Sequence, residues 1–205
     1  MFGIKFGGAK KRDEPEGVYL TARLNARVQP IDRGDHFEDP LHDALEKAGI
    51  GAVTGGGTQL AEEPAGIEYC DLEVRVSDLS DVNLKAITDK LEDLGAPKGS
   101  KLILDANGPN SEGREIPFGK FEGIGVFLDG QDLPEEVYEQ SDINHVIEEM
   151  ERLMGEKGDF RGYWEGSNEV ALYCYGPSFE AMRDAIQPFL NEYPLCQGAR
   201  VEQIA

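Results

Sequence analysis

Histidines and carboxylates gather near the start of the first expected helix, a combination that could bind a metal ion. His36 and His42 stand among three aspartates, Asp35, Asp39 and Asp43. Imidazole nitrogens and carboxylate oxygens are common ligands of zinc and related metals. Their spacing matches no two-histidine metal motif, however, and Asp39 followed by a proline fits a helix N-cap. We therefore expect no metal site and no cofactor.

A glycine-rich segment could in principle cradle a phosphate. It consists of Thr54, Gly55, Gly56, Gly57 and Thr58. Phosphate-binding loops end in Gly-Lys-Ser/Thr and lead into a helix, whereas here the ending is absent and the surrounding residues predict a strand. Glycine inside a strand usually marks a bulge or a close backbone approach, which is the favoured interpretation. The alternative is a small-molecule or catalytic site that combines this segment with His36.

Cysteine chemistry offers no clear nucleophile. Cys70, Cys174 and Cys196 are widely spaced and odd in number. This usage fits reduced thiols in a cytoplasmic protein better than a disulfide framework. Cys70 and Cys174 fall on the apolar phase of their expected strands, where a cysteine acts as a small hydrophobic residue. We expect no catalytic residue and a non-enzymatic protein.

Negative charge is the strongest functional hint. Asp and Glu outnumber Lys and Arg by 40 to 20, and no Lys or Arg lies between Lys120 and Arg152. Such a surface repels nucleic acid and anionic membranes and steers basic proteins toward it. The alternative is a solvated face that only keeps the protein soluble. The candidate residues for binding a partner in this segment are Asp132, Glu135, Glu136, Glu139, Glu148 and Glu149.

The order of expected elements, β-α-β-β-α-β, runs twice along the chain. In the first expected strand, 18–28, apolar and polar residues alternate with the period of two that puts one face in a core. The sequence therefore predicts an α+β fold of two tandem ferredoxin-like domains, each a four-stranded antiparallel sheet backed by two helices. Their expected bounds are 17–106 and 115–205. Residues 1–16 are expected to form a mobile arm and 107–114 a linker.

The two expected sheets differ on their open faces. In the first, Arg23 and Arg27 should lie near Asp71 and Glu73 as cross-strand charge pairs. In the second, the outward residues are aromatic: Phe127, Tyr173 and Tyr175. Such a patch usually has a cover, which could be the first domain, a second copy in a homodimer, or another protein. Aromatic residues on such sheets can stack RNA bases, but the basic rim is absent, so no nucleic acid is expected.

Taken together, these features favour an acidic, cytoplasmic protein-binding module, inhibitor-like or immunity-like, that engages a basic protein partner. The N-terminus has no continuous apolar stretch and no segment is long enough to span a membrane, so no membrane association is expected. The competing hypothesis is the small-molecule or catalytic site around the glycine segment and His36.

Overall fold

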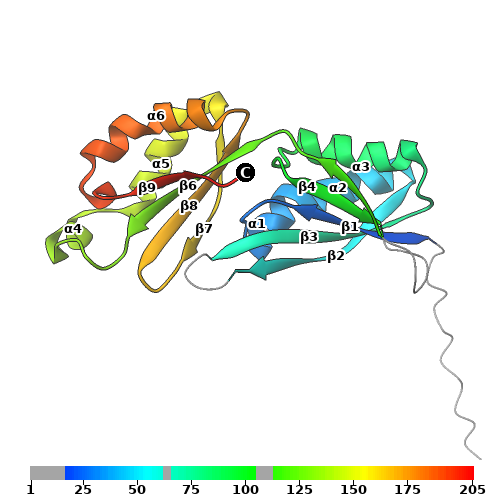
Figure 1. The fold of residues 1–205 in the computed structure, drawn as a ribbon, viewed down its shortest axis with the longest axis horizontal. Helices are drawn as coiled ribbons and strands as arrows, with labels where there is room; N and C mark the ends of the chain where they lie inside the picture. Colours follow the sequence, from blue (N-terminus) through cyan, green and yellow to red (C-terminus); the bar gives the residue numbers. More distant parts are fainter. Residues whose placement is uncertain (1–16, 62–65, 105–112) are drawn as a thin grey trace, which may run out of the picture.

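The protein is a mixed α+β structure with two antiparallel sheets of five and four strands (Figure 1). This computed structural model describes residues 17–61, 66–104 and 113–205. The predicted arm at 1–16 and residues 107–112 of the predicted linker at 107–114 lie outside the described residues, and Arg114 belongs to strand β5. No helix of the described part is long and apolar enough to cross a membrane.

The first sheet has the strand order β2-β3-β1-β4-β5, and helices cover one of its faces (Figure 1). Its strands are β1 (Val18–Leu24), β2 (Gly51–Leu60), β3 (Ile67–Val76), β4 (Ser100–Leu104) and β5 (Arg114–Phe118). Its helical segments are α1 (Pro30–Arg33), the π-helical turn η1 (Gly34–Glu38), α2 (Asp39–Ala48) and α3 (Asp81–Asp93). The strand β5 pairs with β4, so residues expected to open the second domain extend the first sheet.

The alternation in β1 places Leu20, Ala22 and Leu24 in the core. On the opposite face, Arg23 stands directly across from Asp71 and its guanidinium donates two hydrogen bonds of 2.9 Å to that carboxylate. The predicted pair is confirmed for Arg23. Arg27, in contrast, lies beyond the end of β1 and contacts the second sheet.

The helix that leads to α2 starts earlier than the sequence predicts. Asp39 has helical backbone angles and follows η1 directly, so its predicted role as the N-cap is wrong. The helical segment begins instead at Pro30, where the fixed φ of proline suits a first helical position. Residues 30–38 carry no regular apolar stripe, which explains why periodicity does not reveal them.

The second sheet has the order β7-β8-β6-β9. Its strands are β6 (Glu122–Asp129), β7 (Asp159–Glu165), β8 (Glu169–Gly176) and β9 (Arg200–Gln203). Its helical segments are α4 (Glu135–Gln140), α5 (Ile143–Met154), η2 (Gly155–Lys157), α6 (Phe179–Glu192) and η3 (Pro194–Cys196). The apolar stripes of α5 and α6 pack on Val126, Leu172 and Cys174 to form a core on one face of this sheet.

The other face of the second sheet packs against the first domain. Phe127, Tyr173 and Tyr175 belong to the same continuous core as Ala26 and Val28, and all are buried. The strand phase predicted for the aromatic residues is therefore correct, and the first domain is their cover. This also explains why the alternation continues past the end of β1 at Leu24, since Ala26 and Val28 fill the space between the two sheets.

Hydrogen bonds fix the position of the second sheet on the first domain. The Tyr175 hydroxyl accepts a 2.7 Å bond from the backbone N–H of Arg27. Arg161 donates from Nη1 to the Leu94 carbonyl, 3.2 Å away at the end of α3, where the helix dipole favours a cation. A register shift on β7, between Phe160 and Gly162, marks a β-bulge at Arg161, and such bulges commonly redirect a side chain.

A buried polar cluster connects η1 to β2. The Arg33 guanidinium hydrogen-bonds the Glu38 carboxylate and the Thr58 hydroxyl, and Arg33 is only 8% exposed. These groups lie over Gly56. A Cβ atom at Gly56 would overlap the Glu38 carboxylate and would lie 2.7 Å from the Asp71 carbonyl oxygen, whereas a Cβ at Gly57 would meet no atom within 4 Å.

This cluster predicts opposite effects for two neighbouring substitutions. Gly56→Ala should lower the free energy of unfolding by about 1–3 kcal/mol, because the added methyl group overpacks the Arg33–Glu38 pair. Gly57→Ala should raise it by up to about 1 kcal/mol, because the site is open and alanine restricts the unfolded chain. Urea denaturation followed by circular dichroism measures both. Equal effects at the two positions would show that the cluster does not constrain Gly56.

The contact between the two sheets predicts different stability effects for Tyr175→Phe and Tyr173→Phe. Tyr175→Phe should cost about 1–3 kcal/mol of unfolding free energy, because it leaves the partly buried N–H of Arg27 without its acceptor. The Tyr173 hydroxyl is buried without a hydrogen bond of standard geometry among the described residues, and the nearby Arg27 guanidinium is the cation that favours its ionised form, so Tyr173→Phe should cost less than Tyr175→Phe. The single tryptophan, Trp164, packs on the same core, and its fluorescence during urea unfolding reports the contact. A larger loss for Tyr173→Phe than for Tyr175→Phe would contradict this assignment.

Candidate functional site

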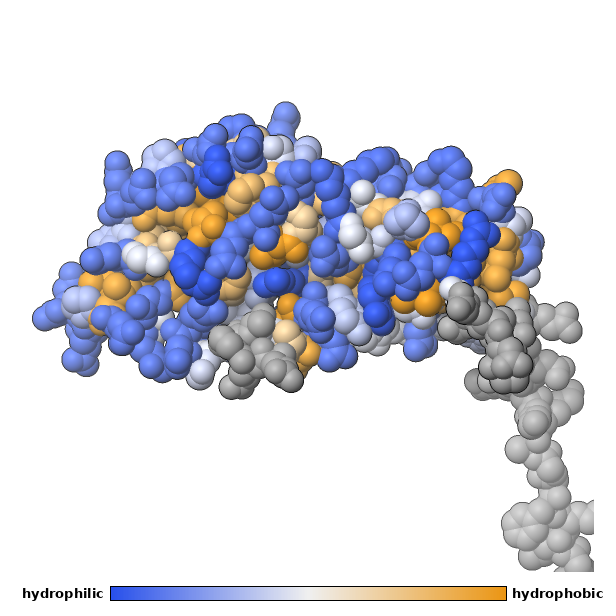
Figure 2. Space-filling model, in the orientation of Figure 1, coloured by the Kyte–Doolittle hydropathy of each residue, from blue (hydrophilic) through white to orange (hydrophobic). Residues whose placement is uncertain are grey.

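The predicted acidic segment surrounds α4, which lies at the end of the molecule far from the first sheet (Figure 1). No residue of α4 is buried, and Glu135, Glu136 and Glu139 are exposed. Figure 2 shows that hydrophilic residues dominate this end of the molecule, with apolar atoms visible among them. Tyr138 is half-buried and packs on the core of the second sheet, whereas the three glutamates face away from any packing partner that would dictate their residue type.

A hydrogen-bonded turn and the packing of Leu133 and Tyr138 on the second core together hold α4 in place. The Asp129 carboxylate accepts 2.8 Å hydrogen bonds from the N–H groups of Gln131 and Asp132, which lower the pKa of Asp129. The Tyr138 hydroxyl accepts a 3.1 Å bond from the Leu133 N–H. This arrangement presents the acidic side chains of α4 on a short, locally braced projection.

Most of the predicted acidic residues have no cationic neighbour. Among the described residues, no Lys, Arg or His nitrogen lies within 4.0 Å of the carboxylates of Asp132, Glu135, Glu136, Glu139 or Glu148. Glu149 differs, because Arg152 donates to it at 2.7 Å and lowers its pKa. We name the five residues Asp132, Glu135, Glu136, Glu139 and Glu148 the acidic surface.

The aromatic residues predicted to bind a partner are not part of a free surface. Phe127, Tyr173 and Tyr175 are 7%, 0% and 2% exposed beneath the first domain. Burial raises the pKa of both tyrosine hydroxyls. A partner protein or a second copy could reach them only if the two sheets separated, so in this structure the cover is the chain itself.

The hollow that His36 lines includes no residue of the glycine segment. Thr54 donates to the Glu73 carbonyl at 3.2 Å, and Thr58 to the Val28 carbonyl at 3.3 Å, so these hydroxyls serve the fold. A register shift on β2, between Val53 and Gly55, agrees with the predicted bulge.

His36 lies at the junction of the two domains. It lines an open hollow of 360 Å³ together with Asp159 and Arg161. Burial lowers the pKa of His36, and the nearby Arg161 lowers it further. Within the ranges that the structure describes, no group of three or more His, Cys, Asp and Glu side chains is placed to hold a metal ion.

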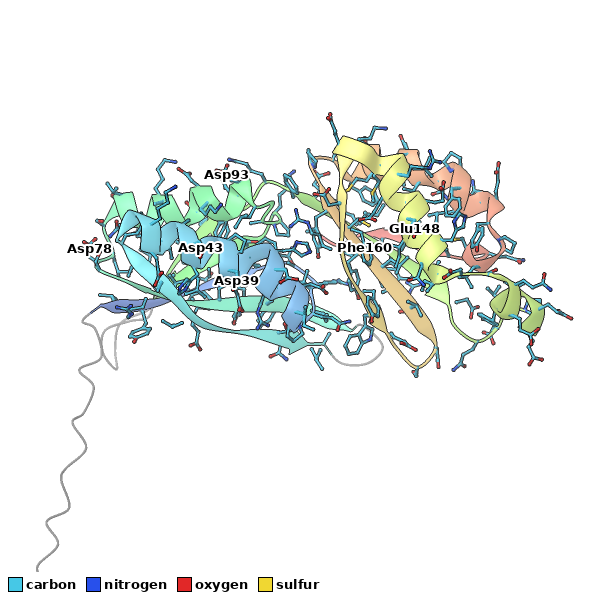
Figure 3. The ribbon with its side chains drawn as sticks, turned by 180° about the vertical axis from the view of Figure 1, so that it is seen from behind. Asp39, Asp43, Asp78, Asp93, Glu148 and Phe160 are labelled. Carbon is cyan, nitrogen blue, oxygen red and sulfur yellow. The ribbon has the colours of Figure 1, made fainter. Side chains whose placement is uncertain are left out.

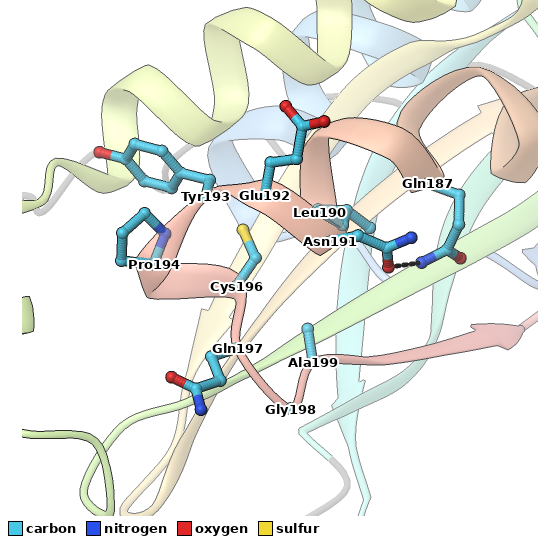
Figure 4. Close-up of a pocket in the computed structure, with 10 residues that line it drawn as sticks. All are labelled: Gln187, Leu190, Asn191, Glu192, Tyr193, Pro194, Cys196, Gln197, Gly198 and Ala199. Carbon is cyan, nitrogen blue, oxygen red and sulfur yellow. Dashed lines mark hydrogen bonds between the residues drawn. The ribbon is translucent and has the colours of Figure 1, made fainter.

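Cys196 lies in a hollow of 330 Å³ at the end of α6 (Figure 4). Gln187 and Asn191 on its wall are hydrogen-bonded to each other at 2.9 Å. Burial raises the pKa of Cys196 to about 11 and that of Cys70 to about 12. Thiols with raised pKa values are poor nucleophiles at neutral pH.

A pocket of 400 Å³ between α5 and β7 was not expected from the sequence. Ile143 and Ile147 of α5 form one wall, Tyr163 of β7 another, and Val170 and Leu172 of β8 lie between them. Periodicity assigns Ile143 and Ile147 simply to the buried stripe of a helix. It gives no sign that β7, an edge strand, leaves them partly uncovered. We name this feature the α5–β7 pocket.

Comparisons with known proteins identify no family for this chain. No protein-family model and no curated protein matches it. Among solved structures, an unknown protein from Galdieria sulphuraria is similar at 11% identity and a TM-score of 0.30, covering 92% of this chain and 98% of its own. The first two RRM domains of the yeast poly(U) binding protein align at 8% identity and a TM-score of 0.24, covering 92% and 99%. The regulatory subunit of aspartate kinase from Thermus thermophilus aligns at 13% identity and a TM-score of 0.25, covering 83% and 92%. Similarities at this level carry no argument about the function of the chain.

Proposed function

We propose that the protein is a non-enzymatic binding module whose acidic surface engages a basic protein partner. The observation that carries this proposal is α4, a helix with three exposed glutamates, no buried residue and no neighbouring cation among the described residues. Because packing accounts for Tyr138 but not for the three glutamates, a role in recognition supplies a reason for them.

Repulsion within the acidic surface supports the same proposal. Glu135 and Glu139 lie one turn apart on α4, a spacing at which like charges destabilise a helix by about 0.2–0.5 kcal/mol. Basic side chains of a partner would relieve this repulsion on binding. Residues 108–205 carry a net charge of −13 out of the total of −20. The negative electrostatic field of this half of the chain would also speed up association with a basic protein.

An inhibitor-like or immunity-like role fits such a module, because neutralising a basic enzyme requires electrostatic complementarity and no catalytic group. The three free cysteines are all buried, which supports a cytoplasmic location. The proposal of a small-molecule site is weaker, since Thr54, Thr58 and Gly56 are occupied by contacts within the fold.

We also propose that both halves are variants of the ferredoxin-like fold. The orders β2-β3-β1-β4 and β7-β8-β6-β9 support this, because each places the third strand of the half between the first and the second. On this view, β5 is an addition to the first half.

Charge reversal tests the proposed function. The variant Glu135→Lys/Glu136→Lys/Glu139→Lys should weaken binding of a fluorescent oligolysine peptide at least about tenfold at low salt, because it removes the local attraction. Wild-type binding should itself weaken steeply as salt rises. Fluorescence anisotropy measures both effects.

The control carries the same change in net charge on the first domain, as Asp43→Lys/Glu68→Lys/Glu73→Lys, three positions that are also exposed. This control should weaken binding only about two- to threefold, through the long-range field. If both triple variants weaken binding equally, the attraction belongs to the whole molecule and the acidic surface is not the site.

A further inference from the structure

We infer that the α5–β7 pocket receives an apolar side chain of the basic partner, so that the partner's recognition segment is an apolar anchor flanked by Lys or Arg. This inference rests on the proposed function and adds to it the chemical character of the partner. It follows from the lining of the pocket, from the charges around it and from its position at the start of α5, the helix that follows α4 in the sequence.

The lining of the pocket is apolar and partly preformed. Leu172 is fully buried at 0% exposure, whereas Tyr163 is 45% exposed, so the pocket has a closed floor and an open wall. Its volume of 400 Å³ lies within the range of about 300–1,000 Å³ typical of ligand-binding sites. An exposed aromatic side chain beside an apolar cavity is the arrangement that anchors use at protein interfaces.

Carboxylates border this pocket. Glu165 is itself a lining residue and is exposed. Glu148 lies one helical turn beyond Asn144, another lining residue, and Figure 3 shows it on α5, the helix that forms the wall. Asp142 caps α5 at the same end by accepting a hydrogen bond from the Asn144 N–H at 2.8 Å. No lining residue is basic.

The pocket also lies close in sequence to the acidic surface. Its first lining residue, Ile143, starts α5 only three positions after Gln140, the last residue of α4. A segment that places an apolar side chain in the pocket would have its flanking residues near Glu165 and Glu148, and the glutamates of α4 would attract it through their longer-range field. In interfaces of this kind the apolar anchor supplies most of the affinity, and the charged border supplies orientation and rate.

Charge decides between this occupant and a second copy of the chain. Each copy carries −20, and a homodimer through the pocket would bring two carboxylate borders together without a compensating cation from the lining. A partner segment with Lys or Arg on either side of its apolar residue would avoid this repulsion between carboxylates. A basic partner with an apolar anchor is therefore the occupant that this surface fits.

Two peptides that differ at one residue test the inference. They are fluorescent Lys-Lys-Gly-Leu-Gly-Lys-Lys and Lys-Lys-Gly-Ser-Gly-Lys-Lys, titrated with the full chain at low salt and followed by anisotropy. The wild-type protein should bind the leucine peptide about tenfold more tightly, as expected for burial of one leucine side chain. In Tyr163→Ser this preference should fall to less than about threefold, because one wall of the pocket is lost.

The matched control is Tyr19→Ser, which removes a tyrosine of similar exposure, 48%, from β1 of the first domain. It should keep the full preference for leucine. Chemical-shift changes at the Ile143 and Ile147 methyl groups on adding the leucine peptide would support the site independently of any variant, and thermal melts confirm that each variant is folded.

The outcomes separate this inference from the proposed function. Equal affinity for both peptides, or a preference that persists in Tyr163→Ser, would overturn the pocket inference while leaving the acidic surface intact. If neither peptide binds in a salt-dependent way, the proposed function fails together with the inference. A wild-type dimer in sedimentation experiments that Tyr163→Ser disrupts would also overturn the inference, because a second copy would then be the occupant.

Discussion

The bond from the Arg27 N–H to the Tyr175 hydroxyl lies within the contact that joins the two sheets, and this contact decides which face of the second sheet is available for binding. Three aromatic side chains that could not stand in water as one patch are buried against the first domain. The open face of the second sheet is therefore unavailable for binding. The surfaces left to the second domain are its helical side, its sheet edges and α4.

The sequence predicts some of this arrangement because local patterns carry it. Alternation in β1 predicts which residues enter the core, and the pairing of Arg23 with Asp71 follows from strand order and register. The outward phase of Tyr173 follows in the same way. These features depend on the period of two in a strand and on the handedness of a crossover, which hold before any tertiary contact is known.

Other features could not be predicted, for physical reasons that differ. An apolar face shows that a cover exists but not which surface provides it, since the first domain and a second copy would satisfy the same hydrophobic requirement. The helical start at Pro30 lacks periodicity because Arg33 faces the polar cluster over Gly56 rather than an apolar core. The α5–β7 pocket depends on how β7, an edge strand, is placed beside α5, and the residue pattern of either element alone does not give that tertiary placement.

The first domain braces the α5–β7 pocket although it carries none of the lining. Gln29, next to the residues that cover the aromatic face, donates from Nε2 to the Tyr163 carbonyl at 2.9 Å. Arg161, two residues before Tyr163 on the bulged strand, is held at the end of α3. Because β7 is an edge strand with one neighbour in its sheet, these two contacts supply the restraint that a second neighbouring strand would give. The position of Tyr163, one wall of the α5–β7 pocket, therefore depends on the packing of the two sheets. Through this packing, the first domain influences how the pocket of the second domain would bind a partner.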